Sequence, residues 1–137
     1  MDDMNQHIKV ACRYGSTEAL KVLMKQPGAR MIVRSQMYEL SRLVITGQRK
    51  PRERVNAMQM LLHAKAHVDD AKKGVTALCM AADLGNLPIV RLLVKAKANV
   101  NAAYGKTTVL YTAAMNGYSE IVRCLLKAGA RVNATRW

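Results

Sequence analysis

Apolar residues near the end of the chain recur with the period of an amphipathic helix. Between Val109 and Met115 they are spaced i, i+3, i+4, which places them on one helix face. We expect Gly117 to end this helix, because glycine adopts a left-handed backbone at little cost. A second amphipathic helix is predicted from Ser119 to Ala128, with Ser119 as its N-cap and Gly129 as its stop. The apolar positions of the two helices are Leu110, Ala113 and Ala114, and Ile121, Val122, Leu125 and Leu126.

The same pattern occurs earlier in the chain. The segment from Gly74 to Ala102 matches the segment from Lys106 to Ala134 with an offset of 32 residues. Weaker copies lie in residues 1–33 and 34–70, and the second of these has extra residues at 48–54, where Pro51 favours a loop. Helix pairs this short bury their apolar faces only against neighbouring pairs. The sequence therefore predicts a single domain over residues 1–137, with about four stacked repeats at 1–33, 34–70, 71–102 and 103–135.

The two strong copies share a specific set of residues. In the earlier copy they are Thr76, Leu78, Ala81, Ala82, Gly85, Ile89, Val90, Leu92, Leu93 and Ala98–Ala102, and in the later copy Thr108, Leu110, Ala113, Ala114, Gly117, Ile121, Val122, Leu125, Leu126 and Gly129–Ala134. This set resembles the ankyrin repeat. The resemblance implies an all-α solenoid of helix-turn-helix repeats with short hairpin turns, acting as a non-catalytic protein-interaction module. The family's Thr-Pro-Leu-His is incomplete here, and Lys65 and Lys97 replace a helix-ending glycine, so we expect backbone strain.

Charge is the second informative property. The net charge is +13, from 22 Lys and Arg against 9 Asp and Glu, with a sequence pI near 10.1. Such a chain is attracted to acidic partners in a salt-dependent way. Aromatic residues are 4% and Phe is absent, so we predict an aliphatic core. Three cysteines, an odd number, and the lack of a long apolar run favour an intracellular location, cytoplasmic or nuclear.

The resemblance also implies a concave binding surface, formed by the hairpin tips and the outward face of each first helix. By register, the candidate contact residues are Arg13, Tyr14, Arg34, Met37, Ile45, Lys72, Lys73, Asp83, Leu84, Tyr104, Met115 and Asn116. This mixture of basic, aromatic and apolar groups suits a protein partner. The alternative for each residue is contact with water or with a neighbouring repeat only.

Four basic residues gather in the insertion, and we call them the basic finger: Arg49, Lys50, Arg52 and Arg54. The finger could dock an acidic partner or act as a nuclear-import signal. Alternatively, it is a solvated loop whose task is to start the next helix, with Pro51 near the first turn. A second basic set recurs on the outer helices and predicts a ridge, for which solubility is the simpler explanation. It consists of Lys21, Lys25, Arg91, Lys95, Arg123 and Lys127.

Residues typical of catalysis or metal binding are scarce. His63 and His67 are four apart, but by register they do not share a helix face, so we expect no metal site. Gly105-Lys106-Thr107 lacks the upstream glycine and strand of a phosphate loop. The sequence therefore predicts a non-enzyme without cofactors. The alternative function is a basic nucleic-acid or anionic-surface binder, against which stands the small number of aromatic residues among the basic ones.

The last repeat lacks the polar outer face of a terminal repeat. Ile121, Val122, Cys124 and Leu125 offer no polar cap, although Trp137 could cover part of that end. We therefore expect further chain, self-association or a partner at the C-terminal repeat.

Overall fold

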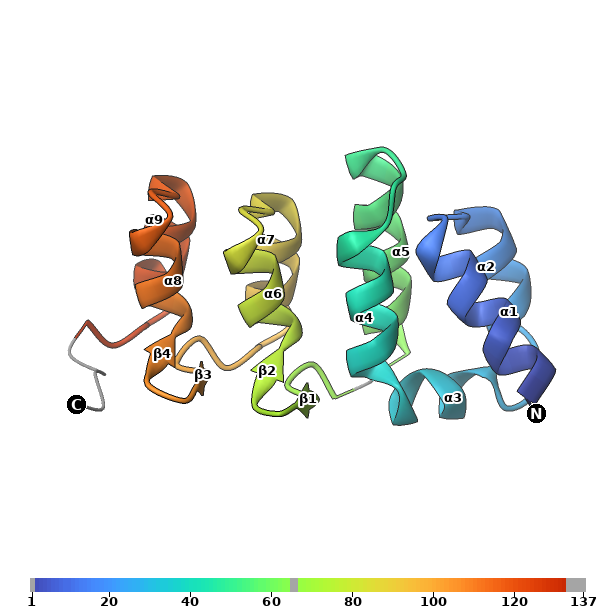
Figure 1. The fold of residues 1–137 in the computed structure, drawn as a ribbon. Coiled ribbons are helices and arrows are strands. Elements are labelled where there is room, and N and C mark those ends of the chain that lie inside the picture. Colours follow the sequence, from blue (N-terminus) through green and yellow to red (C-terminus); the bar gives the residue numbers. More distant parts are fainter. Residues whose placement is uncertain (1, 65–66, 133–137) are drawn as a thin grey trace. The chain divides into compact units, whose positions relative to one another are not determined.

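A computed structural model describes residues 2–64 and 67–132 of this chain. They fall into two compact units, which we call the N-terminal unit (Met1–His67) and the C-terminal unit (Val68–Trp137). Each unit contains two helix pairs, as the repeat pattern predicts (Figure 1). The predicted all-α fold is thus confirmed, whereas the arrangement of all repeats in a single domain stays a prediction.

The N-terminal unit contains five of the described helices. They are α1 (Asp2–Arg13), α2 (Thr17–Met24), α3 (Ala29–Ser35), α4 (Met37–Thr46) and α5 (Pro51–His63). Helix α1 packs against α2 and α4, and α5 packs against α2 and α4, so the two pairs stack. The core is aliphatic, as expected, and includes Ile8, Cys12, Leu20, Leu40, Val44, Met58 and Leu61. Burial raises the pKa of the Cys12 thiol to about 12.

Helix α3 is a feature that the sequence pattern did not predict. It lies across the ends of the helices at the junction of the first two repeats (Figure 1), where a hairpin was expected. Gly28 precedes it with a left-handed backbone (φ 84°), and its apolar side chains Ala29, Ile32 and Val33 are buried. The helix forms because these three residues are spaced at i, i+3, i+4 and find apolar partners on α1, α2 and α4.

The extra residues of the second repeat extend a helix rather than a loop. Helix α4 ends at Thr46, and α5 already begins at Pro51. Proline suits the first helical position, because its fixed φ is helical and its missing N–H has no partner there in any case. The prediction of a loop over 48–54 is therefore wrong for residues 51–54. Pro51 lies in the first turn of α5, as the alternative interpretation expected.

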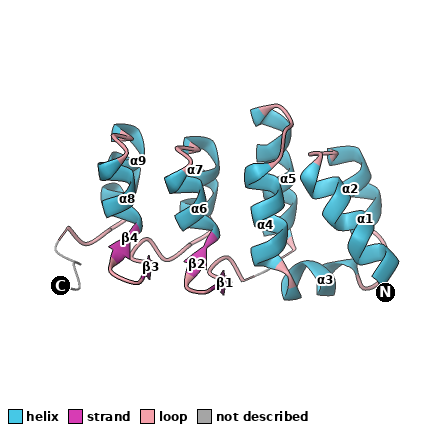
Figure 2. Ribbon diagram, viewed as in Figure 1, coloured by secondary structure: helices cyan, strands magenta, loops and turns pink. Residues whose placement is uncertain are grey.

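The C-terminal unit repeats one motif twice: a two-stranded hairpin followed by two helices (Figure 2). The first copy comprises β1 (Ala71–Lys72), β2 (Val75–Thr76), α6 (Ala77–Asp83) and α7 (Leu87–Lys95). The second comprises β3 (Ala103–Tyr104), β4 (Thr107–Thr108), α8 (Val109–Met115) and α9 (Ser119–Lys127). Both hairpins are antiparallel, with Ala71 opposite Thr76 and Ala103 opposite Thr108. Their two-residue turns have positive φ at Lys73 and Gly74, and at Gly105.

The helices of the C-terminal unit begin with side-chain caps at three places. Thr76 Oγ1 accepts a hydrogen bond from Cys79 N–H (3.3 Å), and Thr108 Oγ1 accepts one from Tyr111 N–H (3.0 Å). Asn86 Oδ1 caps α7 in the same way. Tyr118 occupies the corresponding position before α9, and no side chain caps that helix. Ser119 is the first helical residue, so its prediction as the N-cap is wrong.

Repeat-to-repeat hydrogen bonds join the loops of the C-terminal unit. Asp69 Oδ1 accepts from Asn99 N–H (2.7 Å), and Asn101 Oδ1 accepts from Arg131 N–H (2.8 Å), at the same repeat positions. Lys97 stands in place of a helix-ending glycine and has the left-handed backbone from which we expected strain, with φ of 68°. The corresponding prediction for Lys65 lies outside the described residues.

The apolar stripe of α9 is divided between the core and the surface. Ile121 and Leu125 are buried, so they are not part of an uncapped end, contrary to our expectation. Val122 and Cys124 are half-buried, and Leu126 is exposed. Trp137 lies outside the described residues. The exposed apolar surface of this helix is therefore smaller than the sequence pattern indicates.

Candidate functional site

The C-terminal ends of α1 and α4 enclose a hollow of about 300 Å³ in the N-terminal unit. It is lined by Arg13, Tyr14, Arg42, Leu43, Thr46, Gly47 and Gln48. The two helix ends approach so closely that a Cβ on Gly47 would lie 2.6 Å from the Arg13 carbonyl oxygen. Two predicted contact residues, Arg13 and Tyr14, line this hollow, and both are exposed.

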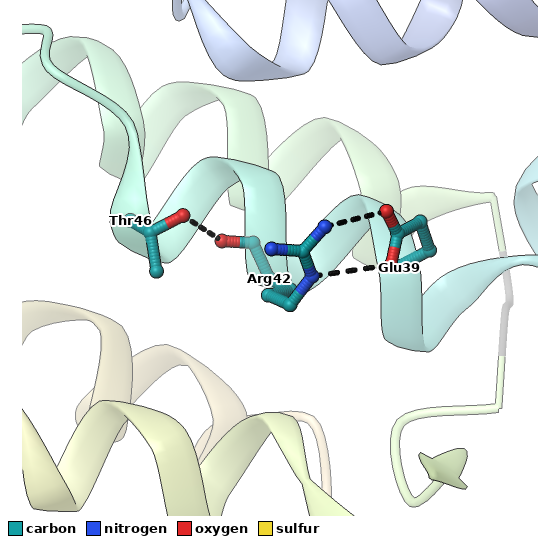
Figure 3. A network of polar contacts seen from close by, with 3 residues as sticks. All are labelled: Glu39, Arg42 and Thr46. Atoms are coloured by element: carbon teal, nitrogen blue, oxygen red, sulfur yellow. Dashed lines mark hydrogen bonds and ion pairs between the residues drawn. The ribbon is translucent and has the colours of Figure 1, made fainter.

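Arg42 belongs to this hollow, although sequence reasoning did not select it. Its Nη2 and Nε donate to the two carboxylate oxygens of Glu39, at 2.7 and 3.1 Å (Figure 3). Thr46 Oγ1 donates to the Arg42 carbonyl oxygen at 2.7 Å. The hydrogen bonds to Glu39 raise the pKa of Arg42 and hold its guanidinium in one orientation. The i, i+3 spacing of an acid and a base on one predicted helix is the signal that could have identified it.

The four residues of the basic finger have different environments. Arg49, Lys50 and Arg52 are exposed at the start of α5. Arg54 instead donates from Nη1 to the Ile45 carbonyl oxygen (3.0 Å) and so closes the end of α4. Arg49 Nε is 4.0 Å from Glu53 Oε2, an ion pair too long for a hydrogen bond. Three finger residues thus have exposed side chains, whereas Arg54 has a structural task.

Two predicted contact residues are buried, and a third, Arg34, is exposed but also makes a structural hydrogen bond. Met37 and Ile45 are each 1% exposed, so they belong to the interior and not to a binding surface. Met37 begins α4 directly after α3, where a hairpin tip was expected. Arg34 lies on α3 and donates from Nε to the Ala64 carbonyl oxygen at the end of α5 (3.1 Å). Helix α3 thus replaces the hairpin on which the predictions for Arg34 and Met37 depended.

The predicted residues of the C-terminal unit lie at two ends of α6 and α8. Lys72, Lys73 and Tyr104 are exposed on the hairpins, before the helices begin. The other group follows or ends the same helices: Asp83, Leu84, Met115 and Asn116. Seven-residue helices separate the groups by roughly 10 Å, from a rise of 1.5 Å per residue. We call the second group the helix-end surface.

The helix-end surface carries large apolar side chains in solvent. Leu84 is 55% exposed and Met115 is 65% exposed. Asn116 Nδ2 donates to the Asp83 carbonyl oxygen (3.5 Å), which links the ends of α6 and α8. Tyr111 is a further exposed residue that we did not select: it is 45% exposed, whereas Cys79 at the same repeat position is 4% exposed. Its position among mostly apolar residues of α8 gave no signal of exposure.

Residues 2–64 and 67–132 offer little that could bind a metal ion. Among them, no three His, Cys, Asp or Glu side chains gather closely enough to hold a metal ion. His63 ends α5, and His67 lies beyond that helix. Within residues 2–64 and 67–132, every helix is too short or too polar to cross a membrane.

A family model described as "Ankyrin repeats (3 copies)" matches residues 50–136. This chain belongs to the ankyrin repeat family. The match begins at the start of α5 and includes the whole C-terminal unit up to Arg136, which confirms the predicted family and fold. A search of curated proteins found no match. Ankyrin repeats are generally protein–protein interaction modules and are typically non-catalytic.

Proposed function

We propose that this ankyrin repeat chain is a non-catalytic module that binds an acidic surface or peptide of another protein. The contact residues would be the helix-end surface, the hairpin residues Lys72, Lys73 and Tyr104, and the exposed finger residues Arg49, Lys50 and Arg52. The single observation that carries the proposal is the exposure of Leu84 and Met115 next to polar Asp83 and Asn116.

Exposed apolar side chains of this size favour a protein partner. Leu84 and Met115 do not contribute to the core, and burying such a side chain in an interface is worth about 1.5–3 kcal/mol. A few apolar anchors within a polar rim are typical of protein interfaces. The nucleic-acid alternative would instead need aromatic platforms for base stacking among the basic residues. On the helix-end surface, the apolar residues are aliphatic.

The finger residues supply the preference for acidic groups. Arg49, Lys50 and Arg52 surround the N-terminus of α5, where the helix dipole is also positive. Cations at this position are repelled by the positive end of the helix dipole, so they do not stabilise the helix. An anionic group of a partner would be attracted by both the cations and the dipole. Together with the net charge of +13, this supports an acidic contact on the partner.

Affinity capture from nuclease-treated lysate tests the proposal. The wild-type chain is compared with Leu84→Ser/Met115→Ser and with Arg49→Ala/Lys50→Ala/Arg52→Ala, leaving Arg54 intact because it holds the end of α4. We expect the wild-type chain to capture a discrete protein that stays bound after nuclease treatment and in moderate salt. Either variant should capture less of it. Lys25→Ala/Lys95→Ala, which removes two exposed charges outside the proposed contact residues, serves as the control and should retain it.

Two results would contradict the proposal. Bound material that disappears after nuclease treatment would show that nucleic acid is the ligand. Equal capture by the wild type and by both surface variants would show that the partner, if one is present, binds elsewhere.

A further inference from the structure

The outer helices of the C-terminal unit form a groove that the proposed function does not use. Helices α7 and α9 pack side by side, and the groove between them has a volume of about 420 Å³. Its principal lining residues are Arg91, Val94, Glu120, Arg123, Cys124 and Lys127. They come from the second helix of each repeat, whereas the helix-end surface is formed by α6 and α8.

The groove has an excess of positive charge. Arg123 Nη1 binds Glu120 Oε1 at 2.5 Å, so these two charges offset each other. Arg91 and Lys127 are exposed, and neither forms an ion pair with any of the described residues. The sequence pattern predicted a basic ridge here, for which solubility was a sufficient explanation. A groove lined by two unpaired cations can bind an anionic ligand, because both cations can pair with the same ligand. A solvated ridge has no such enclosed space.

The remaining lining of the groove is apolar. Val94 and Cys124 are half-buried, and Ala128 lies beside them at the end of α9. An apolar lining with cationic walls fits a ligand that has an apolar group between anionic ones. A peptide with an apolar side chain flanked by carboxylates has this form. A nucleic-acid strand fits less well, because the lining includes no aromatic side chain for base stacking.

We propose that the groove between α7 and α9 binds an acidic peptide segment of another protein. Carboxylates of the segment pair with Arg91 and Lys127, and an apolar side chain between them contacts Val94 and Cys124. This inference does not depend on the proposed function, since it concerns different helices and different residues. A chain with both surfaces could join two partners.

Cys124 provides a built-in reporter of the groove. Cys12 and Cys79 are buried, so Cys124 is the most accessible of the three thiols. The probe is a short synthetic peptide with glutamates on both sides of one leucine, and the readout is the alkylation rate of each cysteine by mass spectrometry. At a peptide concentration about nine times the Kd, the bound fraction is about nine-tenths, so we expect alkylation of Cys124 to slow by about tenfold.

Charge reversal then tests the residues. Arg91→Glu/Lys127→Glu should weaken peptide binding at least about tenfold, since two ion pairs are replaced by repulsion. The charge-matched variant Lys25→Glu/Lys106→Glu, with both changes outside the groove, should bind nearly as the wild type does. Circular dichroism of both variants confirms folding, which is expected because all four side chains are exposed.

Several outcomes would overturn the inference. One such outcome is that the peptide leaves the alkylation rate of Cys124 unchanged. Another is that both charge-reversed variants lose peptide binding equally, because this would indicate attraction to net charge alone. The same peptide with glutamines, or with serine in place of leucine, should bind more weakly, and undiminished binding would contradict the inference. A single-stranded oligonucleotide that protects Cys124 better than the peptide does would assign the groove to nucleic acid.

Discussion

Gly85 and Gly117 occupy the same position in successive repeats, and both have a left-handed backbone, with φ of 69° and 76°. Their surroundings differ. A Cβ on Gly85 would lie 2.7 Å from Cζ of Tyr118, whereas a Cβ on Gly117 would meet no atom within 4 Å. The glycine requirement is thus conformational at both positions and also steric at Gly85, because the Tyr118 ring covers it.

These two glycines allow the cost of a left-handed backbone to be separated from the cost of a steric clash. Gly117→Ala should reduce the free energy of unfolding by about 1–2 kcal/mol, the cost of a left-handed residue with a Cβ. Gly85→Ala should cost about 1–3 kcal/mol more, because the Tyr118 ring must move. Urea unfolding measures both values. Adding Tyr118→Ala should reduce the extra cost of Gly85→Ala. If Gly85→Ala and Gly117→Ala lower the free energy of unfolding equally, the Tyr118 ring moves aside at no cost.

At the scale of the element, the helix ends determine much of the repeat geometry. Lys97 N–H donates to the Val94 carbonyl oxygen, and Ala98 N–H donates to the Leu93 carbonyl oxygen, each at 3.0 Å. These bonds end α7 and require a positive φ at Lys97. Gly129 occupies the same position after α9, with φ of 93°. The two helices therefore end alike, although only the second has the residue that favours this ending.

Exchanging lysine and glycine at positions 97 and 129 tests whether the left-handed backbone strains Lys97. Lys97→Gly should raise the free energy of unfolding by about 0.5–1 kcal/mol, because relief of the left-handed strain exceeds the entropy that glycine adds to the unfolded chain. Gly129→Lys should lower it by a similar amount. Thermal unfolding of the two variants and the wild type measures these changes. If neither substitution changes the stability, the left-handed conformation at Lys97 carries no strain.

At the scale of the whole molecule, the stability of the chain should depend on pH through Cys12. The pKa of this thiol is about 12 in the folded state, against 9.0 for an exposed thiol. Between these values the unfolded chain releases the proton and the folded chain retains it. Below pH 9 the thiol is neutral in both states, so its burial makes the free energy of unfolding no lower. Between pH 9 and 12 the free energy of unfolding falls as pH rises, by up to about 1.4 kcal/mol per pH unit.

Comparison with Cys12→Ala isolates this effect from other groups that titrate at high pH. The variant should be less stable at pH 8, because a buried group is removed. Its free energy of unfolding should fall less steeply than that of the wild type from pH 9 to 11. Denaturant unfolding at several pH values measures both slopes. Parallel slopes would show that Cys12 ionises as readily in the folded state as in the unfolded state.

The repeat period and the helices of the C-terminal unit could be predicted because their signals are local. Apolar spacing, Gly117 and the paired segments from Gly74 and Lys106 are properties of neighbouring residues. The helix Val109–Met115 was predicted with its observed bounds. Most of the exposed candidate residues follow from the same register, which explains why Leu84 and Met115 were identified.

Other features depend on contacts between residues distant in the sequence. Burial of Met37 and Ile45 follows from the packing of α4 against its neighbours α1, α3 and α5. Arg54 gains its task only because the Ile45 carbonyl oxygen lies within reach.

The sequence by itself thus determined the repeat, the family and the helical fold, since these arise from periodic apolar positions and from residues that end helices. Only the tertiary structure decided which candidates are buried and where the predicted basic ridge borders a groove, because both depend on how the helix pairs pack. The burial of Met37 and Ile45 and the groove between α7 and α9 are consequences of that packing.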